Sequence, residues 1–471
     1  MTEPLICHSP FPYTASQLFA LFADERDAVF LDSSLTNHLG RYSIIGLVPY
    51  HRVSVEQGQL KIDGKAREGT AETYLKAYLK KHYQANPTDL PLTAGAIGYV
   101  SYDYGLARHG MKSRHAPAFP LPDMNWVFYD FFIIEHRQSH AVWFAANGQT
   151  MPAEALLAQM KEKIRTRLQE RSFPRTGENP QYAITVQPDS TREDYQRALK
   201  KLRNYIVAGD VYVTNFTSTF HVQSHCPPYT FFSRLRRDNP SPFGAYLQYG
   251  AYQIISASME RLLCLRDDQI ETRPIKGTRR RGKTPAEDKR LRQELAQSQK
   301  DQSELLMIVD LERNDLHKIC RPGSVSVPTL FAIEPYATVF HLIAGVTGAL
   351  RPGKTAIDAL TALFPGGSIT GAPKQRAMEI IDELEFSRRQ LYTGTIGYLS
   401  LDGNCDLNIV IRTAVHHDDQ YTIGVGGGIT AESDEAFEYE EIWQKAKALL
   451  SALKGDTFNL ILQEVSRLFR R

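Results

Sequence analysis

Stretches typical of β-strands outnumber stretches typical of helices in this chain, and the two kinds do not alternate regularly. Residues 29–31, 126–135 and 211–216 are rich in β-branched and aromatic residues, which favour strands. Residues 70–84 instead repeat apolar side chains at helical spacing. A regular alternation would predict a parallel sheet with crossover helices. The irregular order predicts an α+β fold with large, mostly antiparallel β-sheets.

The length of 471 residues allows two or three domains, or one large intertwined domain. A polar segment containing glycine and proline at residues 172–180 predicts a linker. We therefore expect an N-terminal region over residues 1–175 and a second domain over residues 185–456. The basic, amphipathic tail at residues 457–471 is expected to be a peripheral helix, with partner binding as the alternative.

Composition excludes several classes of function. A formal net charge of +2 predicts no general attraction to nucleic acid or to an anionic membrane. No apolar run is long enough to span a bilayer, and the first residues lack the pattern of a signal peptide. The five cysteines are scattered, without the spacing of a metal site or a redox motif. These features predict a cytoplasmic protein with neither a nucleic-acid nor a membrane partner.

Residues 270–278 predict a short strand that ends in a turn, because strand formers are followed by Pro274 and Gly277. Lys276 would then lie at a strand end beside a glycine, where another molecule can approach the backbone closely. A lysine in that position can act as a nucleophile if its surroundings lower its pKa. The alternative is an ordinary surface lysine at a turn.

Two predicted helices each carry a pair of acids three residues apart: Asp301 with Glu304, and Glu438 with Glu441. Residues at this spacing share one helix face, and here both pairs border an apolar stripe. If the helices face each other, the acids supply the hard oxygen ligands that suit Mg²⁺. Lys445, one turn after Glu441, could reach the same site. The alternative is two ordinary charged helices with ion pairs such as Glu441–Lys445.

Two glycine-rich segments are further candidates for a binding site. Residues 366–374 have the glycine separation of a phosphate loop, but Ala372 and Pro373 stand where that motif needs lysine and serine or threonine. What remains is a set of backbone N–H groups before a helix, which suits any anion. Residues 426–428, expected to form a turn, offer a second set, and Arg412 suits a carboxylate. The combination predicts a small substrate with several negative charges.

Together these motifs resemble those of the chorismate-utilising enzyme family, which includes anthranilate, isochorismate, salicylate and aminodeoxychorismate synthases. The resemblance is dense over residues 191–455 and looser in the N-terminal region. It implies a sandwich-like core with flanking helices, of the anthranilate synthase component I type, and a chorismate-binding catalytic domain at residues 185–456. The motifs that carry the resemblance are residues 258–261, 273–278, 304–315, 366–374, 411–413 and 426–429.

Within this family the resemblance favours the aminodeoxychorismate synthases, which carry lysine at the position of Lys276, where anthranilate synthases carry alanine. The implied reaction converts chorismate and ammonia to 4-amino-4-deoxychorismate, in the 4-aminobenzoate branch of folate synthesis. Nothing in the chain resembles a glutaminase, so ammonia is expected from a separate glutamine amidotransferase subunit, in a heterodimer. The alternatives are an anthranilate synthase component I or a dual-function enzyme and, more remotely, a non-catalytic tryptophan-binding regulator.

The resemblance implies that the neutral amine of Lys276 attacks C2 of chorismate while the C4 hydroxyl leaves. Glu260 would protonate that hydroxyl, because hydroxide is a poor leaving group without a general acid. His341 would orient the hydroxyl, and ammonia would then attack C4 and expel the lysine. Met259 and Val213 stand where the family usually has proline and glutamine, and we expect this difference to affect local packing rather than the reaction.

Three further sets of residues follow from the resemblance alone. Mg²⁺ would be bound by Glu304 and Glu441, with Asp301 and Glu438 supporting it through water. The carboxylates of chorismate would be held by Arg412, Lys445, Ser368, Gly426, Gly427 and Gly428. A tryptophan pocket in the N-terminal region would include Ser33, Arg41, Tyr42, Pro242 and Phe243.

Overall fold

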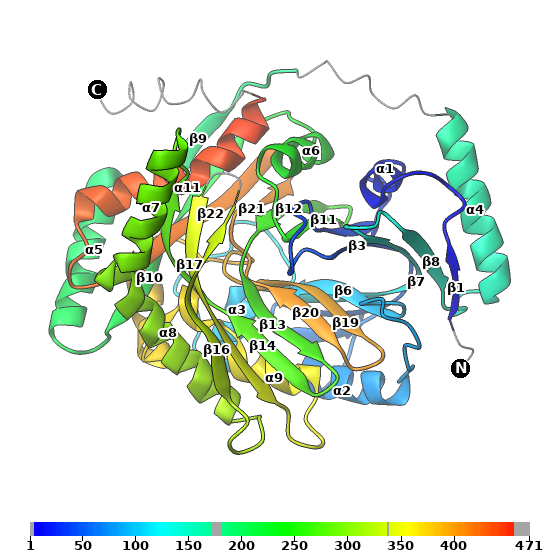
Figure 1. The fold of residues 1–471 in the computed structure, drawn as a ribbon, viewed down its shortest axis with the longest axis horizontal. Helices are drawn as coiled ribbons and strands as arrows, with labels where there is room; N and C mark the ends of the chain where they lie inside the picture. The colour runs from blue at the N-terminus through cyan, green and yellow to red at the C-terminus, as the bar shows by residue number, and fades with distance from the viewer. Residues whose placement is uncertain (1–3, 171–179, 337–338, 456–471) are drawn as a thin grey trace.

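Antiparallel β-sheet dominates the computed structural model, which describes residues 4–170, 180–336 and 339–455 (Figure 1). Helices flank this sheet structure, so the predicted α+β class is confirmed. Residues 172–179 of the linker predicted at 172–180, and the predicted tail at residues 457–471, lie outside the described residues. No helix within the described residues is long and apolar enough to cross a membrane.

Two long strands pair with each other, and each of the two sheets of the molecule begins at one of them. They are β3 (Tyr42–Glu56) and β7 (Met124–His136). Residues 44–46 of β3 begin the first sheet, which continues through β2 (Val29–Asp32), β11 (Phe243–Gln248), β12 (Tyr252–Ser258), β21 (Thr413–His417) and β22 (Gln420–Ile429) to β10 (Val213–Gln223). Residues 124–129 of β7 begin the second sheet, which continues through β6 (Gly95–Val100), β19 (Thr395–Ser400), β20 (Cys405–Asn408), β13 (Arg261–Arg266) and β14 (Gln269–Arg273) to β17 (Val339–Ala349). Strands β15 (Ile275–Arg280) and β16 (Ser326–Pro335) pair with β17.

Short strands complete the edges of both sheets. Strand β8 (Val142–Ala146) pairs with β7, and β1 (Leu5–His8) pairs with β8. Strand β4 (Gln59–Ile62) pairs with β3, and β5 (Lys65–Ala66) pairs with β4. Strands β9 (Thr185–Pro188) and β18 (Gly371–Ala372) pair with β10. Strand β3 is long because Val48 at φ 58° and a register shift after Pro49 bend it without ending it.

The helices cover the outer faces of the two sheets. In Figure 1, α5, α7, α8 and α11 lie on one side of the molecule, and α1 and α4 lie at the opposite side beside β1, β3 and β8. Thr191 is the N-cap of α5, because its side chain accepts a hydrogen bond from the Asp194 N–H, and Gly455, at φ 87°, ends α11. The helices are α1 (Ala15–Ala20), α2 (Ala71–Lys81), α3 (Tyr102–Arg108), α4 (Ala153–Glu170), α5 (Arg192–Val207), α6 (Pro228–Asp238), α7 (Pro285–Gln297), α8 (Gln299–His317), α9 (Ala356–Leu363), α10 (Lys374–Leu384), α11 (Glu435–Lys454) and the 3₁₀ turn η1 (Gly367–Ile369).

Apolar side chains that alternate along the strands build the core on both faces of the sheets. In β11, Ala245 and Leu247 join the cluster between the inner strands, and Tyr246 joins the cluster under the helices. The predicted N-terminal region and the predicted second domain share this sheet network, because β2 pairs with β11 and β6 pairs with β19.

Two passages of the chain between the sheets, one in each direction, lie side by side. One passage joins β12 to β13 through Glu260, and the other joins β20 to β21 through Arg412. They are linked by hydrogen bonds from the Ile409 N–H to the Glu260 carbonyl and from the Ala257 N–H to the Arg412 carbonyl, of 2.9 and 3.0 Å. The strand order therefore brings two predicted site residues together from distant parts of the sequence.

Candidate active site

The predicted catalytic residues gather where β15 and β17 of the second sheet approach β22 of the first. A Cβ atom placed on Gly428 of β22 would lie 3.1 Å from the Lys276 Nζ and 3.8 Å from a Glu304 carboxylate oxygen. A Cβ on Gly427 would lie 3.2 Å from the Lys445 Nζ and 3.4 Å from a Glu438 oxygen. The missing side chains of these glycines leave a space bordered by charged groups from three elements of the fold, β15, α8 and α11.

The prediction of a turn directly after Lys276 was wrong, because β15 continues to Arg280. Gly277, at φ 72°, instead forms a bulge at which the pairing with β17 shifts register. A Cβ on Gly277 would lie only 2.8 Å from the Asp301 Cγ, so α8 packs directly against this bulge. The bulge therefore fits α8 against the strand beside Lys276.

The environment of Lys276 favours a neutral amine. Its Nζ donates a hydrogen bond of 2.9 Å to the Ser368 carbonyl. Burial lowers the pKa of Lys276, although Glu304 and Glu260 partly oppose that shift. A lysine with a lowered pKa and an open neighbouring space has the properties of a nucleophile.

Glu260 has the properties of a general acid. It is 4% exposed and accepts a hydrogen bond of 3.3 Å from the Ile275 N–H. Burial raises the pKa of Glu260 more than the neighbouring Ser368 and Lys276 lower it. A carboxyl group with a raised pKa can carry and release a proton nearer to neutral pH.

His341 lies on β17 next to the same space. Its Nδ1 is 3.0 Å from the Thr278 Oγ1, and its buried Nε2 has no hydrogen-bond partner among the described residues. Burial, with the charges of Arg412 and Lys445, lowers the pKa of His341 to about 3. The ring is therefore neutral at physiological pH and has one nitrogen free to interact with a substrate.

The two acids of the α8 pair differ in their interactions. Asp301 forms an ion pair of 3.0 Å with Arg279 of β15. Glu304 is buried and accepts no hydrogen bond from any described residue. Burial raises the pKa of Glu304, while the charge of Lys276 lowers it.

The paired acids of α11 also differ. Glu441 forms an ion pair of 2.7 Å with Lys445. Burial alone would raise the pKa of Glu441, but the charges of Lys445 and Lys300 hold it below its usual value. Burial and the charge of Glu441 instead raise the pKa of Glu438 to about 7.

The predicted turn at residues 426–428 was also wrong, because these glycines belong to β22, whose pairing with β10 continues to Ile429. Lys445 donates a hydrogen bond of 2.7 Å to the Gly426 carbonyl, which fixes its ammonium group beside this strand. Arg412, at φ 52°, donates one N–H to the Lys445 carbonyl. The two cations and the open strand edge lie together, as a site for carboxylates requires.

A network that the sequence reasoning missed holds the segment carrying Ser368. Glu312 of α8, 2% exposed, accepts a hydrogen bond of 3.1 Å from the Gly367 N–H, so this N–H is not available to a substrate. Lys374 bonds to Asp315 at 2.6 Å and to the Leu363 carbonyl at 3.1 Å. Glu312 lies two turns after Glu304, among the buried residues of the same helix. Acids that recur within an apolar helix face were the signal available in the sequence.

Val213, one of the two departures from the family pattern, lies in the wall of the site. It is 1% exposed, and its Cγ2 would be 3.9 Å from a Cβ placed on Gly428. An apolar branched side chain therefore stands here, in contact with the space beside Lys276.

The acids fit a magnesium ion only if substrate or water completes its coordination. Within the part of the chain that the structure describes, no three His, Cys, Asp or Glu side chains form a ready metal cluster. Glu304 and Glu441 nevertheless lie close enough for the charge of Glu441 to raise the pKa of Glu304. A buried carboxylate without a hydrogen-bond donor, facing a second carboxylate, suits Mg²⁺, which uses one or two carboxylates and keeps several waters.

The residues of the predicted tryptophan pocket lie at the junction of β2, β3 and β11. Ser33 donates a hydrogen bond of 2.9 Å to the Pro242 carbonyl, and Phe243 begins β11 beside them. The Arg41 guanidinium lies over the Tyr42 ring, 5.6 Å from its centroid. These residues are close together, and binding of tryptophan stays a prediction.

Comparisons with known proteins agree with this geometry. A family model described as chorismate binding enzyme matches residues 27–451. The chain therefore belongs to the family of chorismate-binding enzymes, and it is an enzyme that uses chorismate. The family resemblance of the sequence is confirmed.

Relatives with two different activities are similarly close. An aminodeoxychorismate synthase component 1 from Klebsiella aerogenes is 36% identical over 97% of this chain and all of the relative. An anthranilate synthase component 1 from Aquifex aeolicus is 35% identical over 88% of this chain and 86% of the relative. The crystal structure of anthranilate synthase component I from Streptococcus pneumoniae superposes with a TM-score of 0.80, at 30% identity, over 88% of this chain and 93% of that one. The predicted fold type is thereby confirmed.

Proposed function

We propose that the protein is an aminodeoxychorismate synthase component I, which replaces the C4 hydroxyl of chorismate by an amino group. The observation that carries the proposal is the amine of Lys276. It lies in the site against Gly428, burial lowers its pKa, and Glu260 is close enough to influence that pKa. Relatives named aminodeoxychorismate synthase component 1, including one from Bacillus subtilis at 36% identity, support the proposal.

The first chemical step joins Lys276 to the substrate. The neutral Nζ attacks C2 of the ring, the two ring double bonds each shift by one position, and the C4–O bond breaks. Glu260 gives its proton to the departing oxygen, so water leaves instead of hydroxide. His341 accepts or donates a hydrogen bond to the C4 hydroxyl through its unpartnered Nε2 and orients it for this transfer.

The second step reverses the first with a new nucleophile. Ammonia attacks C4, the double bonds shift back, and the C2–N bond to Lys276 breaks. The nitrogen of Lys276 recovers its electron pair, and a proton from the incoming ammonium passes to the carboxylate of Glu260. The sum of the two steps is chorismate plus ammonia giving 4-amino-4-deoxychorismate plus water, with Lys276 and Glu260 restored.

Substrate carboxylates are held by the cations and glycines at the edge of β22. Arg412 retains guanidinium N–H groups beyond the one donated to the Lys445 carbonyl. Lys445 adds a second positive charge, and Ser368, Gly426, Gly427 and Gly428 leave room for the ligand. Bound Mg²⁺, held by Glu304 and Glu441 with Asp301 and Glu438 beyond, would neutralise the ring carboxylate and the charge that develops during the shift.

Ammonia comes from a separate glutamine amidotransferase subunit in this proposal, as the "component 1" of the relatives' names suggests. Three exposed apolar residues support a partner near the site: Tyr212, Leu306 and Phe437, which are 66%, 45% and 62% exposed. Each lies within two residues of Val213, Glu304 or Glu438 along the chain. Exposed aromatic and aliphatic side chains of this kind are common anchors at protein interfaces.

The test is a product assay with the full chain, chorismate, Mg²⁺ and ammonium at high concentration. We expect 4-amino-4-deoxychorismate, identified by its mass and by conversion to 4-aminobenzoate when an aminodeoxychorismate lyase is added. Anthranilate and pyruvate as the main products would instead identify an anthranilate synthase.

A further inference from the structure

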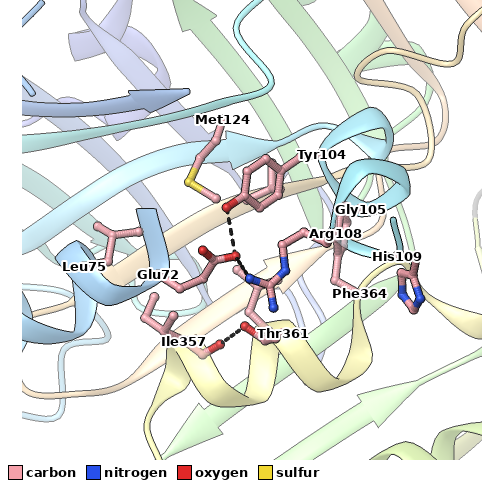
Figure 2. Close-up of a pocket in the computed structure, with 12 residues that line it drawn as sticks. Glu72, Leu75, Tyr104, Gly105, Arg108, His109, Met124, Ile357, Thr361 and Phe364 are labelled. Atoms are coloured by element: carbon pink, nitrogen blue, oxygen red, sulfur yellow. Dashed lines mark hydrogen bonds and ion pairs between the residues drawn. The ribbon is translucent and has the colours of Figure 1, made fainter. Parts of the chain in front are cut away.

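A cavity of about 130 Å³ lies between α2, α3 and α9, and Phe364 is one of its lining residues (Figure 2). Its apolar wall includes Leu75, Met124 and Leu360. Thr361 and Arg108 also line the cavity and are themselves exposed, so it opens to solvent. None of these residues belongs to the site described above.

Glu72, in the wall of the cavity, has hydrogen-bond partners for only one of its two carboxylate oxygens among the described residues. The Tyr104 hydroxyl and an Arg108 N–H both bond to the same oxygen of Glu72, at 2.8 and 2.7 Å, as the dashed lines in Figure 2 show. The other oxygen, Oε2, is buried and has no hydrogen-bond partner among the described residues. A buried carboxylate oxygen without a donor is costly, so a ligand that supplies one would be stabilised here.

The size of the cavity restricts what that ligand can be. An apolar cavity of about 150 Å³ accommodates one benzene molecule. The present cavity of about 130 Å³ is slightly smaller but opens to solvent, so it limits a ligand to one six-membered ring with at most a small substituent. The apolar wall suits the ring, and the Glu72 Oε2 needs an N–H group.

We propose that this cavity is a second ligand site, for a single aromatic ring that carries an amino group. The ring packs against Leu75, Met124 and Leu360, and the amino group donates to the Glu72 Oε2. The site is separate from the proposed reaction and does not depend on it.

The cavity also touches the segment that carries Ser368. Phe364 lines the cavity four residues before Ser368, whose carbonyl accepts the hydrogen bond from Lys276. A Cβ on Gly105, another lining residue, would lie 2.5 Å from the Pro365 Cγ, so α3 and this segment are in direct contact. A bound ring would therefore rest on the beginning of an active-site segment.

Ligand-observed NMR titrations of the full chain at neutral pH test the proposal, with aniline and toluene as probes. Aniline should bind about tenfold more tightly than toluene, because a hydrogen bond to a charged acceptor contributes at least that factor. Glu72→Gln should weaken aniline binding to nearly the level of toluene and leave toluene unchanged. Equal binding of the two probes to the unmodified chain would overturn the role of Glu72.

A second pair of variants tests the location without touching the buried acid. Thr361→Trp places a ring at the mouth and should abolish binding of both probes. Thr73→Trp places the same ring on the exposed face of α2 and should leave both affinities unchanged. Binding that survives Thr361→Trp, or no binding of either probe to the unmodified chain, would overturn the site.

Discussion

Helices α8 and α11 carry the same pattern, two acids three residues apart, yet the two pairs are used differently. In α8 the first acid is paired with a cation, since Asp301 bonds to Arg279 from β15, and the second, Glu304, is left without a donor. In α11 the second acid is paired, since Glu441 bonds to Lys445 of its own helix, and the first, Glu438, has a pKa raised to about 7.

The comparison shows what a helical pattern can and cannot predict. Spacing places both acids of a pair on one helix face. In the α8 pair, the cation that pairs with one acid comes from strand β15; in the α11 pair, it comes from the next turn of the same helix. The spacing therefore does not predict which acid of a pair is left without an ion pair. Neither Glu304 nor Glu438 forms an ion pair with a described residue, and each lies next to one of two adjacent glycines, Glu304 at Gly428 and Glu438 at Gly427.

The largest effect is expected at Lys276, because charged groups of both α8 and α11 influence the pKa of its amine. Lys276→Ala should lower the kcat/KM for aminodeoxychorismate formation by about 100-fold or more, because it removes the proposed covalent route. Product formation at saturating ammonium, followed by chromatography, measures this, and a shift towards anthranilate would sharpen the distinction between the two activities. Lys283→Ala, an exposed lysine seven residues further on, is the control and should be unaffected. Unchanged aminodeoxychorismate turnover in Lys276→Ala would refute the nucleophile.

A smaller effect should separate the two acids within each helix. Glu304→Gln and Glu441→Gln should raise the Mg²⁺ concentration needed for half-maximal activity by about 100-fold, because each removes a proposed charged ligand. Asp301→Asn and Glu438→Gln should raise it by about tenfold, as supporting residues do. Magnesium titrations of initial rates compare the four variants. Equal effects of all four would break the proposed division between ligands and supporting residues.

Helix α8 also carries a third acid, the buried Glu312, whose pKa is raised by burial to about 7. The folded chain binds this proton more tightly than the unfolded chain, so ionisation destabilises the fold as the pH rises from about 4.5 through 7. Glu312→Gln should therefore raise the melting temperature relative to the unmodified chain by roughly 2 °C at pH 8, and by less at pH 5.

Thermal unfolding at the two pH values provides the measurement. Asp310→Asn, which changes an exposed acid of the same helix, serves as the control and should show no pH-dependent difference. A gain in melting temperature that is larger at pH 5 than at pH 8 would contradict a raised pKa for Glu312.

Local patterns in the sequence were sufficient for the fold class and for most of the elements. Segments rich in β-branched and aromatic residues predicted strands such as β2 and β7, and apolar residues at helical spacing predicted α2. The two errors, at Lys276 and at Gly426–Gly428, have one cause. Glycine predicts a turn locally, but pairing with β17 and with β10 keeps both segments in strands. Partners distant in the sequence decided the outcome.

The interactions that hold the site in place were harder to predict from the sequence, because they also depend on partners distant in the sequence. Glu260 and Arg412 lie where the chain passes between the two sheets, a position that only the complete strand order reveals. Glu312 reaches the Gly367 N–H from 55 residues away in the sequence. The motifs suggested which residues carry the chemistry, and long-range packing decides what holds them in place.

The covalent role of Lys276 can be tested directly by intact-protein mass spectrometry. With chorismate and Mg²⁺ but no ammonia, the covalent mechanism predicts a species heavier than the protein by the mass of chorismate less one water, carried on the peptide that contains Lys276. This species should disappear when ammonium is added and should not form in Lys276→Ala. Aminodeoxychorismate formation by the unmodified protein without any such species, or with the modification on another residue, would contradict the covalent role of Lys276.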